Sequence, residues 1–257
     1  MIKFLYSQNL CKPSSDADLS ISHLSMGIRL NRIGCCYDAC KYFDRVNTSI
    51  VNSKNRDTLL VNKLLALRLS CQFDEAERFH QEIMSEYFED LDDQVKMDIV
   101  WEDACRRSAR TGSIKPILKL VKNMASLDES QILAAKMYFY AAGDKKIISS
   151  LPKMKTLYNK KLIGYSFAKR LKTVEVYELI NDDLPRESGL KILCEHLESI
   201  CSIELPEIEL LSYLSSVHWL RKRGFAEFSN FILNEYHSLS FRLSKGLTKD
   251  VLGLISG

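Results

Sequence analysis

Glycine and proline are scarce in this 257-residue sequence, which contains 10 glycines and 5 prolines. Both residues mark the turns of proteins built from many short strands, so their scarcity argues against an all-β fold and favours helices joined by short loops. No stretch approaches the roughly 20 apolar residues of a transmembrane helix, and the first apolar run is too short for a signal-peptide core. We therefore expect an all-α, cytoplasmic protein without a membrane partner.

Sequence motifs of the common catalytic chemistries are also missing. There is no Gly-rich phosphate loop, His-Glu-x-x-His pair, Gly-x-Ser-x-Gly elbow or Asp-rich metal loop. The eight cysteines form no Cys-x-x-Cys pair, so we interpret them as reduced thiols that pack as small apolar residues. The five histidines are scattered. We expect a non-enzymatic protein with no catalytic residues, no metal and no cofactor.

The opening stretch of the chain predicts two helices, about residues 19–33 and 37–46, that turn back on each other at Gly34. Gly27 lies inside the first helix, where glycine lowers helix stability by roughly 1 kcal/mol relative to alanine and so needs a reason. Its missing side chain lets the second helix approach closely. Ala39 is the small residue that faces it, and Phe43 fills the space one turn later.

Weaker copies of this helix–turn–helix arrangement follow along the chain. Each has a turn between two helical runs, with small and aromatic residues near the close contact. The residues that carry these copies are Ala76 after a turn near Cys71, Trp101 before a turn at Gly112, Gly143, a turn near Lys172, and Gly224. The predicted turns are 29 to 52 residues apart, which is irregular for a strict repeat.

The spacing of Gly27, Gly34, Ala39 and Phe43 resembles that of the tetratricopeptide repeat, a helix–turn–helix unit of about 34 residues. The resemblance implies a TPR-like α-solenoid of antiparallel helix pairs that form a right-handed superhelix. It covers residues 1–184 as degenerate copies. Two prolines within 180–209 suggest a soft boundary near Pro185, so residues 185–257 are expected to be a helical continuation or cap, within one domain or as a second one.

Charge is unevenly distributed along the chain. Between Asp74 and Asp103 there are 12 acidic residues and 2 basic ones, whereas from Arg106 to Lys172 there are 16 basic residues and 3 acidic ones. These charges either solvate outer helix faces or line a groove for an anionic partner. In tetratricopeptide-like proteins the first helix of each pair lines the concave surface, which makes the candidate partner-binding residues Arg106, Arg107, Arg110, Lys136, Lys169 and Arg170.

Two kinds of partner are compatible with this pattern. The first is a protein or peptide segment, acidic in character, held by an adaptor, chaperone or regulatory subunit. The alternative is a helical regulatory protein that binds RNA or DNA through its basic 106–172 region. The isoelectric point near 8.3 and the acidic neighbouring segment favour the first. A phenylalanine cluster at Phe225, Phe228 and Phe231 is buried internally or forms a homodimer contact.

Overall fold

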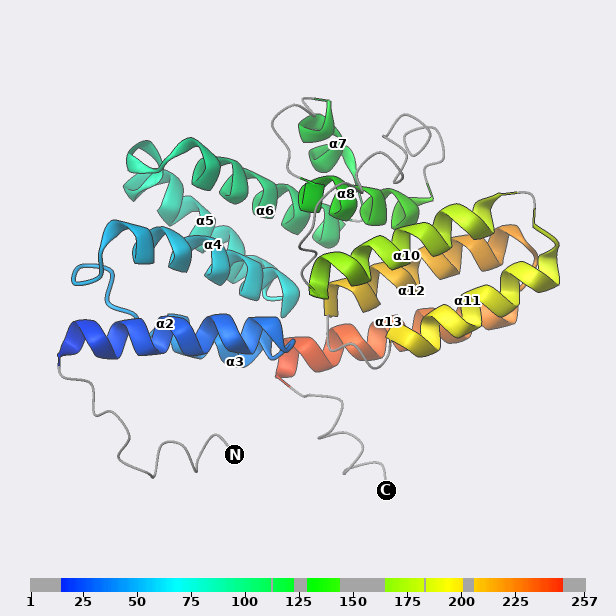
Figure 1. The fold of residues 1–257 in the computed structure, drawn as a ribbon, viewed down its shortest axis with the longest axis horizontal. Coiled ribbons are helices and arrows are strands. Elements are labelled where there is room, and N and C mark those ends of the chain that lie inside the picture. Colours follow the sequence, from blue (N-terminus) through cyan, green and yellow to red (C-terminus); the bar gives the residue numbers. More distant parts are fainter. Residues whose placement is uncertain are drawn as a thin grey trace, which may run out of the picture.

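The structure is a computed structural model that describes residues 15–111, 113–122, 129–143, 165–182, 184–200 and 206–246. Those residues form eleven α-helices and one 3₁₀ turn, without a strand (Figure 1). The prediction of an all-α protein is confirmed for this part of the chain. None of the described helices combines the length and the apolar character needed to span a membrane.

The α-helices contain between 7 and 20 residues. In chain order they are α2 (Asp16–Arg32), α3 (Cys36–Phe43), α4 (Ser53–Leu69), α5 (Phe73–Glu86), the 3₁₀ turn η1 (Phe88–Asp90), α6 (Asp93–Thr111), α7 (Lys115–Val121), α8 (Glu129–Ala142), α10 (Tyr165–Asn181), α11 (Arg186–Ile200), α12 (Pro206–Lys222) and α13 (Ala226–Lys245).

The first two helices, α2 and α3, pack as the predicted hairpin. Ser15 caps α2 by accepting a hydrogen bond from the backbone N–H of Asp18. Gly27 is buried in α2, and a Cβ atom placed there would lie 2.4 Å from Cε1 of Phe43. The side chain of Phe43 thus occupies the space that Gly27 leaves free, while Ala39 is fully buried beside it.

One turn geometry closes three of the helix hairpins. At Gly34 and Gly224, φ is +83° and +80°, and the backbone N–H of the next residue donates to the carbonyl five residues earlier. Cys71 adopts the same left-handed conformation, with φ of +58°, although it is not a glycine. This arrangement satisfies carbonyls that a helix end leaves without partners. Gly143 also has a positive φ, +70°, at the end of α8.

The other predictions made from the repeat pattern are confirmed only in part. Ala76 and Trp101 are buried, as expected of residues at helix contacts. The turn predicted near Lys172 is wrong, because α10 runs without interruption from Tyr165 to Asn181. Gly112 lies outside the described residues.

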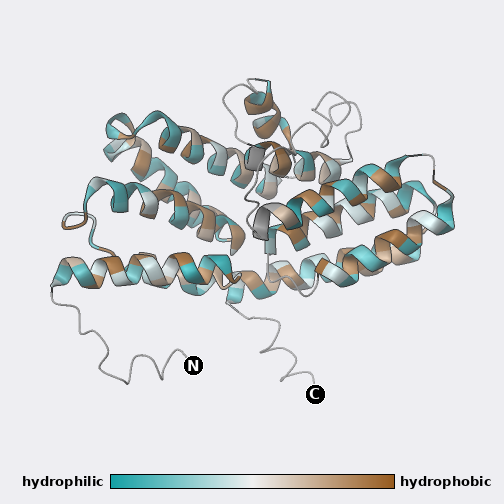
Figure 2. Cartoon of the chain, viewed as in Figure 1, coloured by the Kyte–Doolittle hydropathy of each residue, from teal (hydrophilic) through white to brown (hydrophobic). Residues whose placement is uncertain are grey.

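Buried apolar side chains form two clusters that meet at α6. One extends from Leu24 to Ile99, and the other extends from Trp101 to Leu239. The second cluster continues across the proposed boundary near Pro185, since α10, α11 and α12 all contribute to it. Figure 2 shows hydrophobic and hydrophilic residues interspersed along each helix, as expected of helices with one buried face.

The helices do not pack only with their neighbours in sequence. Helix α12 lies against α8 as well as against α10, α11 and α13, and α13 contacts α3 near the other end of the chain. In Figure 1, α13 returns along the lower edge of the molecule toward α2 and α3. Gly246, which ends α13, lies so close to Tyr37 that a Cβ atom there would overlap the ring. The C-terminal hairpin therefore closes one side of the helix array.

His196 adds a pH-dependent element to the second cluster. Burial, together with the charge of Lys172, lowers the pKa of His196 to about 4. The unfolded chain takes up a proton near pH 6.5 that the folded protein excludes, so the free energy of unfolding should fall by up to about 1.4 kcal/mol per pH unit below pH 6.5. Urea unfolding at pH 7 and pH 5 measures this loss.

The matched variant for this prediction is His196→Phe, which cannot titrate. Phenylalanine preserves an aromatic ring edge-on to Tyr177, whose ring centre lies 5.7 Å from that of His196. We expect a smaller loss of stability between pH 7 and pH 5 in the variant than in the parent. Equal losses in the two proteins would show that His196 does not cause the loss of stability between pH 7 and pH 5.

Candidate functional site

A central cavity of about 350 Å³ lies where α4, α6, α8, α12 and α13 converge. Its wall is mainly apolar and includes Leu69, Phe73, Leu211 and Leu214. Ala109 and His218 line the cavity and are also exposed, so this space is reachable from the surface. The volume falls within the range of small-molecule and anchor-residue pockets.

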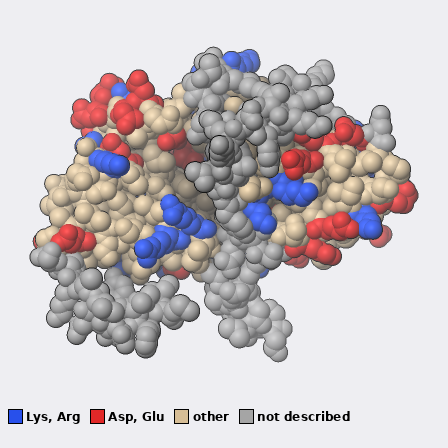
Figure 3. Space-filling model, in the orientation of Figure 1, with Lys and Arg blue, Asp and Glu red and all other residues tan. Residues whose placement is uncertain are grey.

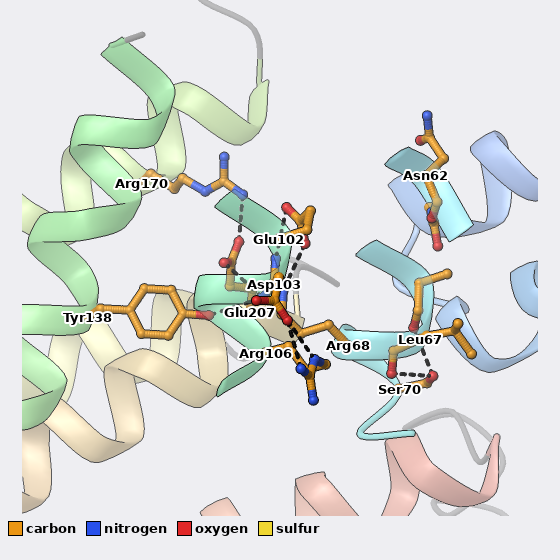
Figure 4. A network of polar contacts seen from close by, with 12 residues as sticks. Asn62, Leu67, Arg68, Ser70, Glu102, Asp103, Arg106, Tyr138, Arg170 and Glu207 are labelled. Carbon is orange, nitrogen blue, oxygen red and sulfur yellow. Dashed lines mark hydrogen bonds and ion pairs between the residues drawn. The ribbon is translucent and has the colours of Figure 1, made fainter. Parts of the chain in front are cut away.

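The cavity wall includes three members of a buried ionic cluster, namely Arg68, Tyr138 and Glu207. Glu102 and Arg170 complete this cluster. Arg68 Nε donates to Glu102 Oε2 over 2.9 Å, and its Nη1 donates to Glu207 Oε1 over 3.2 Å. The same Nη1 donates to the hydroxyl of Tyr138 over 3.1 Å. Figure 4 shows these side chains converging from different helices, with Arg170 reaching the second oxygen of Glu207.

The cluster is electrostatically balanced. Burial raises the pKa of the Glu207 carboxyl, but Arg170 and Arg68 outweigh that effect and lower it to about 2. The pKa of the Arg68 guanidinium is raised: burial lowers it, but Glu102, Tyr138 and Glu207 outweigh that effect. Burial also raises the pKa of Tyr138. Two guanidinium groups therefore face two carboxylates while the phenol stays neutral.

These pKa shifts decide whether Glu207 or Tyr138 can act as an acid–base catalyst. An efficient acid–base catalyst has a pKa near the working pH. Glu207 stays ionised and Tyr138 stays protonated around neutral pH, so neither exchanges protons there. The cluster is suited to hold the ends of several helices in fixed positions around an apolar space.

The six candidate partner-binding residues do not form one open basic row. Arg106 is 5% exposed and pairs with Asp103 over 2.7 Å and with Glu77 over 3.2 Å. Lys136 is 1% exposed, and its Nζ lies 2.7 Å from Glu178 Oε1. Both charges are inside the protein and cannot border a groove.

The other four candidates are paired with carboxylates of the protein or partly buried. Arg107 is exposed but pairs with Asp103, and Arg110 pairs with both Asp74 and Glu77 over 2.9 Å. Lys169 is half-buried on α10, and Arg170 belongs to the ionic cluster.

The acidic and basic segments of the sequence thus meet each other across the α5–α6 contact. Arg106 and Arg110 reach carboxylates of α5 that lie 29 to 36 positions earlier in the chain. Other carboxylates of this region stay exposed, and on the face shown in Figure 3 acidic side chains gather over α5 and η1, at the upper left.

The phenylalanines near the carboxyl terminus divide between the core and the surface. Phe225 is half-buried and stacks on Trp219, with ring centres 6.3 Å apart. Phe228 and Phe231 stack on each other and are 37% and 56% exposed.

No site that contains Arg68, Glu102 and Glu207 was predicted from the sequence. A signal was present for Arg68, which is the only charge within the run LLALRLS at 64–70. A lone arginine on an apolar helix segment needs a buried anionic partner. Nothing in the sequence identifies that partner, because Glu207 lies 139 residues away.

Comparison with known proteins found no match for this chain. No protein-family model, no curated protein and no solved structure matches it. The resemblance to the tetratricopeptide repeat therefore rests on the spacing of Gly27, Gly34, Ala39 and Phe43, and the central cavity has to be interpreted from its own geometry.

Proposed function

We propose that this protein is a non-enzymatic binding protein, with TPR-like helix pairs in a right-handed solenoid, that holds a segment of another protein as an adaptor, chaperone or regulatory subunit. The recurring turns at Gly34, Cys71 and Gly224 support an origin from repeated hairpins. Residues 185–257 then belong to one domain with residues 1–184, which is supported by the packing of α12 against α8.

The observation that carries this proposal is the central cavity with its balanced ionic cluster. A preformed apolar pocket gives affinity because an entering side chain leaves water without the protein having to reorganise. Such pockets receive the few anchor residues that supply most of the binding energy of an interface. The ionic cluster holds the walls of the pocket in place, because its hydrogen bonds join α4, α6, α8, α10 and α12.

The nucleic-acid alternative loses support from the placement of the basic side chains. Phosphate binding requires cations that exchange small counterions at the surface. Arg106, Lys136 and Arg170 instead neutralise carboxylates of the protein itself. The exposed carboxylates of α5 and η1 would repel a polyanion.

The test is selection of peptides from a random displayed library on the full-length protein. Ala142 lines the cavity and is half-buried at the end of α8, so Ala142→Phe should obstruct the pocket. We expect enriched peptides that share an apolar anchor and that bind Ala142→Phe at least about tenfold more weakly than the parent, since the anchor supplies a major share of the binding energy.

The matched control is Ala17→Phe, a half-buried helical alanine on α2 that does not line the cavity. Peptides should bind this variant as they bind the parent. Thermal melting of both variants verifies that each is folded. An unenriched library, or peptides that bind Ala142→Phe and the parent equally, would refute binding of a protein segment through the cavity.

A further inference from the structure

Helix α13 has one buried face and one exposed face. Ser229, Ile232 and Leu239 are buried against the rest of the protein, and Tyr236 lines the central cavity from the same side of the helix. The opposite side carries a row of six exposed residues, which we call the α13 stripe. These residues are Glu227, Phe231, Asn234, Ser238, Phe241 and Lys245. In Figure 1, α13 lies at the lower edge of the molecule.

The spacing along the α13 stripe is that of a contact between two packed helices. Its residues follow one another in steps of 4, 3, 4, 3 and 4 positions. Since a helix turns by about 100° per residue, these steps keep all six side chains within an arc of about 80°. Alternating steps of 3 and 4 are typical of residues that face a second helix running nearly parallel or antiparallel. Phe231 and Phe241 are 56% and 60% exposed, so the stripe presents two large apolar side chains to solvent.

The α13 stripe is complementary to itself when its direction is reversed. Placed antiparallel on an identical stripe, Glu227 lies opposite Lys245, and Phe231 lies opposite Phe241. Asn234 then lies opposite Ser238, two side chains that can hydrogen-bond to each other. All three pairs are centred on position 236, so a single two-fold axis at that position forms each of them twice.

Other arrangements of two stripes lose this complementarity. In a parallel pair, Glu227 would face Glu227 and Lys245 would face Lys245, which places like charges together. An antiparallel pair shifted by one position of the stripe would place phenylalanine opposite asparagine or serine. Polar residues within such a contact fix its register, because a shifted register leaves them facing apolar side chains.

We propose that the α13 stripe binds the α13 stripe of a second copy of this chain, antiparallel, in a two-fold symmetric dimer. The phenylalanines supply affinity, and the charges at the two ends of the stripe set the direction. A contact made by one helix of each copy is small, below the roughly 1,200 Å² of stable complexes, so we expect a weak dimer with a dissociation constant of about 10–100 µM. The stripe and the central cavity lie on opposite faces of α13, so this contact does not depend on the proposed function.

The first test is sedimentation equilibrium of the full-length protein, under reducing conditions and at concentrations up to about 500 µM. We expect a reversible monomer–dimer equilibrium. Phe231→Ser and Phe241→Ser should each weaken the dimer at least about tenfold, since each removes two apolar contacts from a symmetric interface. The matched control is Leu179→Ser, because Leu179 is 46% exposed on α10 and lies outside the stripe. This control and Ala142→Phe should dimerise like the parent.

Exchange of the charges tests the antiparallel direction. Glu227→Lys and Lys245→Glu should each weaken the dimer about fivefold at low salt, because each creates two like-charge pairs across the axis. The double variant restores opposite charges and should dimerise like the parent. A mixture of the two single variants should form the mixed dimer in preference to either homodimer. In a parallel dimer, none of these exchanges would alter the balance of like and opposite charges.

Thermal melting verifies that each variant is folded, as expected for substitutions at exposed positions. A parent protein that stays monomeric at about 500 µM would overturn the proposal. So would a dimer that Phe231→Ser leaves unchanged, which would assign the contact to another surface, or one that is indifferent to the charge exchanges. Selected peptides that bind the monomeric parent but not Phe231→Ser would assign the stripe to a different protein.

Discussion

Replacing Arg68 by methionine is expected to lower the free energy of unfolding by about 3–5 kcal/mol, since removal of one partner leaves a buried charge uncompensated. Methionine preserves most of the length of the side chain but not its charge. Glu102 then loses a partner 2.9 Å away, and Glu207 retains only Arg170. Urea unfolding followed by circular dichroism measures the change.

The control is Arg78→Met, which removes an arginine whose side chain is 75% exposed and which pairs with Glu75 over 3.6 Å. An exposed pair contributes little, so this variant should change stability by less than about 0.5 kcal/mol. The double variant Arg68→Met, Glu102→Gln should be less destabilised than the sum of its single variants, because it also removes a stranded carboxylate. If Arg68→Met were as stable as Arg78→Met, the ionic cluster would have no structural role.

Replacing Gly27 by leucine is expected to destabilise the protein by about 1–3 kcal/mol, the cost of forcing extra atoms into a packed core. The first added carbon would lie 2.4 Å from the ring of Phe43. That ring is 1% exposed, so other residues of the core enclose it. The hairpin of α2 and α3 must therefore open or lose its contact, which thermal melting would detect.

Ser25→Leu is the control for this prediction, because Ser25 is exposed on the same helix. It should melt close to the parent. Shrinking the neighbouring ring tests the cause directly: Gly27→Ala should cost less stability in a Phe43→Leu background than in the parent. If the Gly27→Leu protein melted like the parent, the packing of Phe43 would not require a glycine at position 27.

The helix hairpins could be predicted from the sequence because their determinants are local. Gly34 and Gly224 supply the positive φ that ends a helix, and Pro116 lies at the start of α7, where proline is tolerated. The turn predicted near Lys172 failed for the same reason, since that position has no glycine or proline to interrupt α10.

The candidate site could not be predicted in the same way. The sequence marks Arg106 and Lys136 as charged and helical, but burial depends on which helix covers them. Each pairs with a carboxylate at a distance of at least 29 positions along the chain. The central cavity likewise needs α12 and α13 to fold back onto α4, α6 and α8, which no local pattern predicts.

The sequence alone determined that this protein is helical and where several of its hairpins turn, because helix periodicity and left-handed turn residues act over a few positions. Only the tertiary structure decided that Arg106 and Arg110 pair with carboxylates of α5 and that an apolar cavity remains beside Arg68 and Glu207. Charge pairing and cavity formation depend on distances between side chains far apart in the chain, and those distances are set when the helices pack.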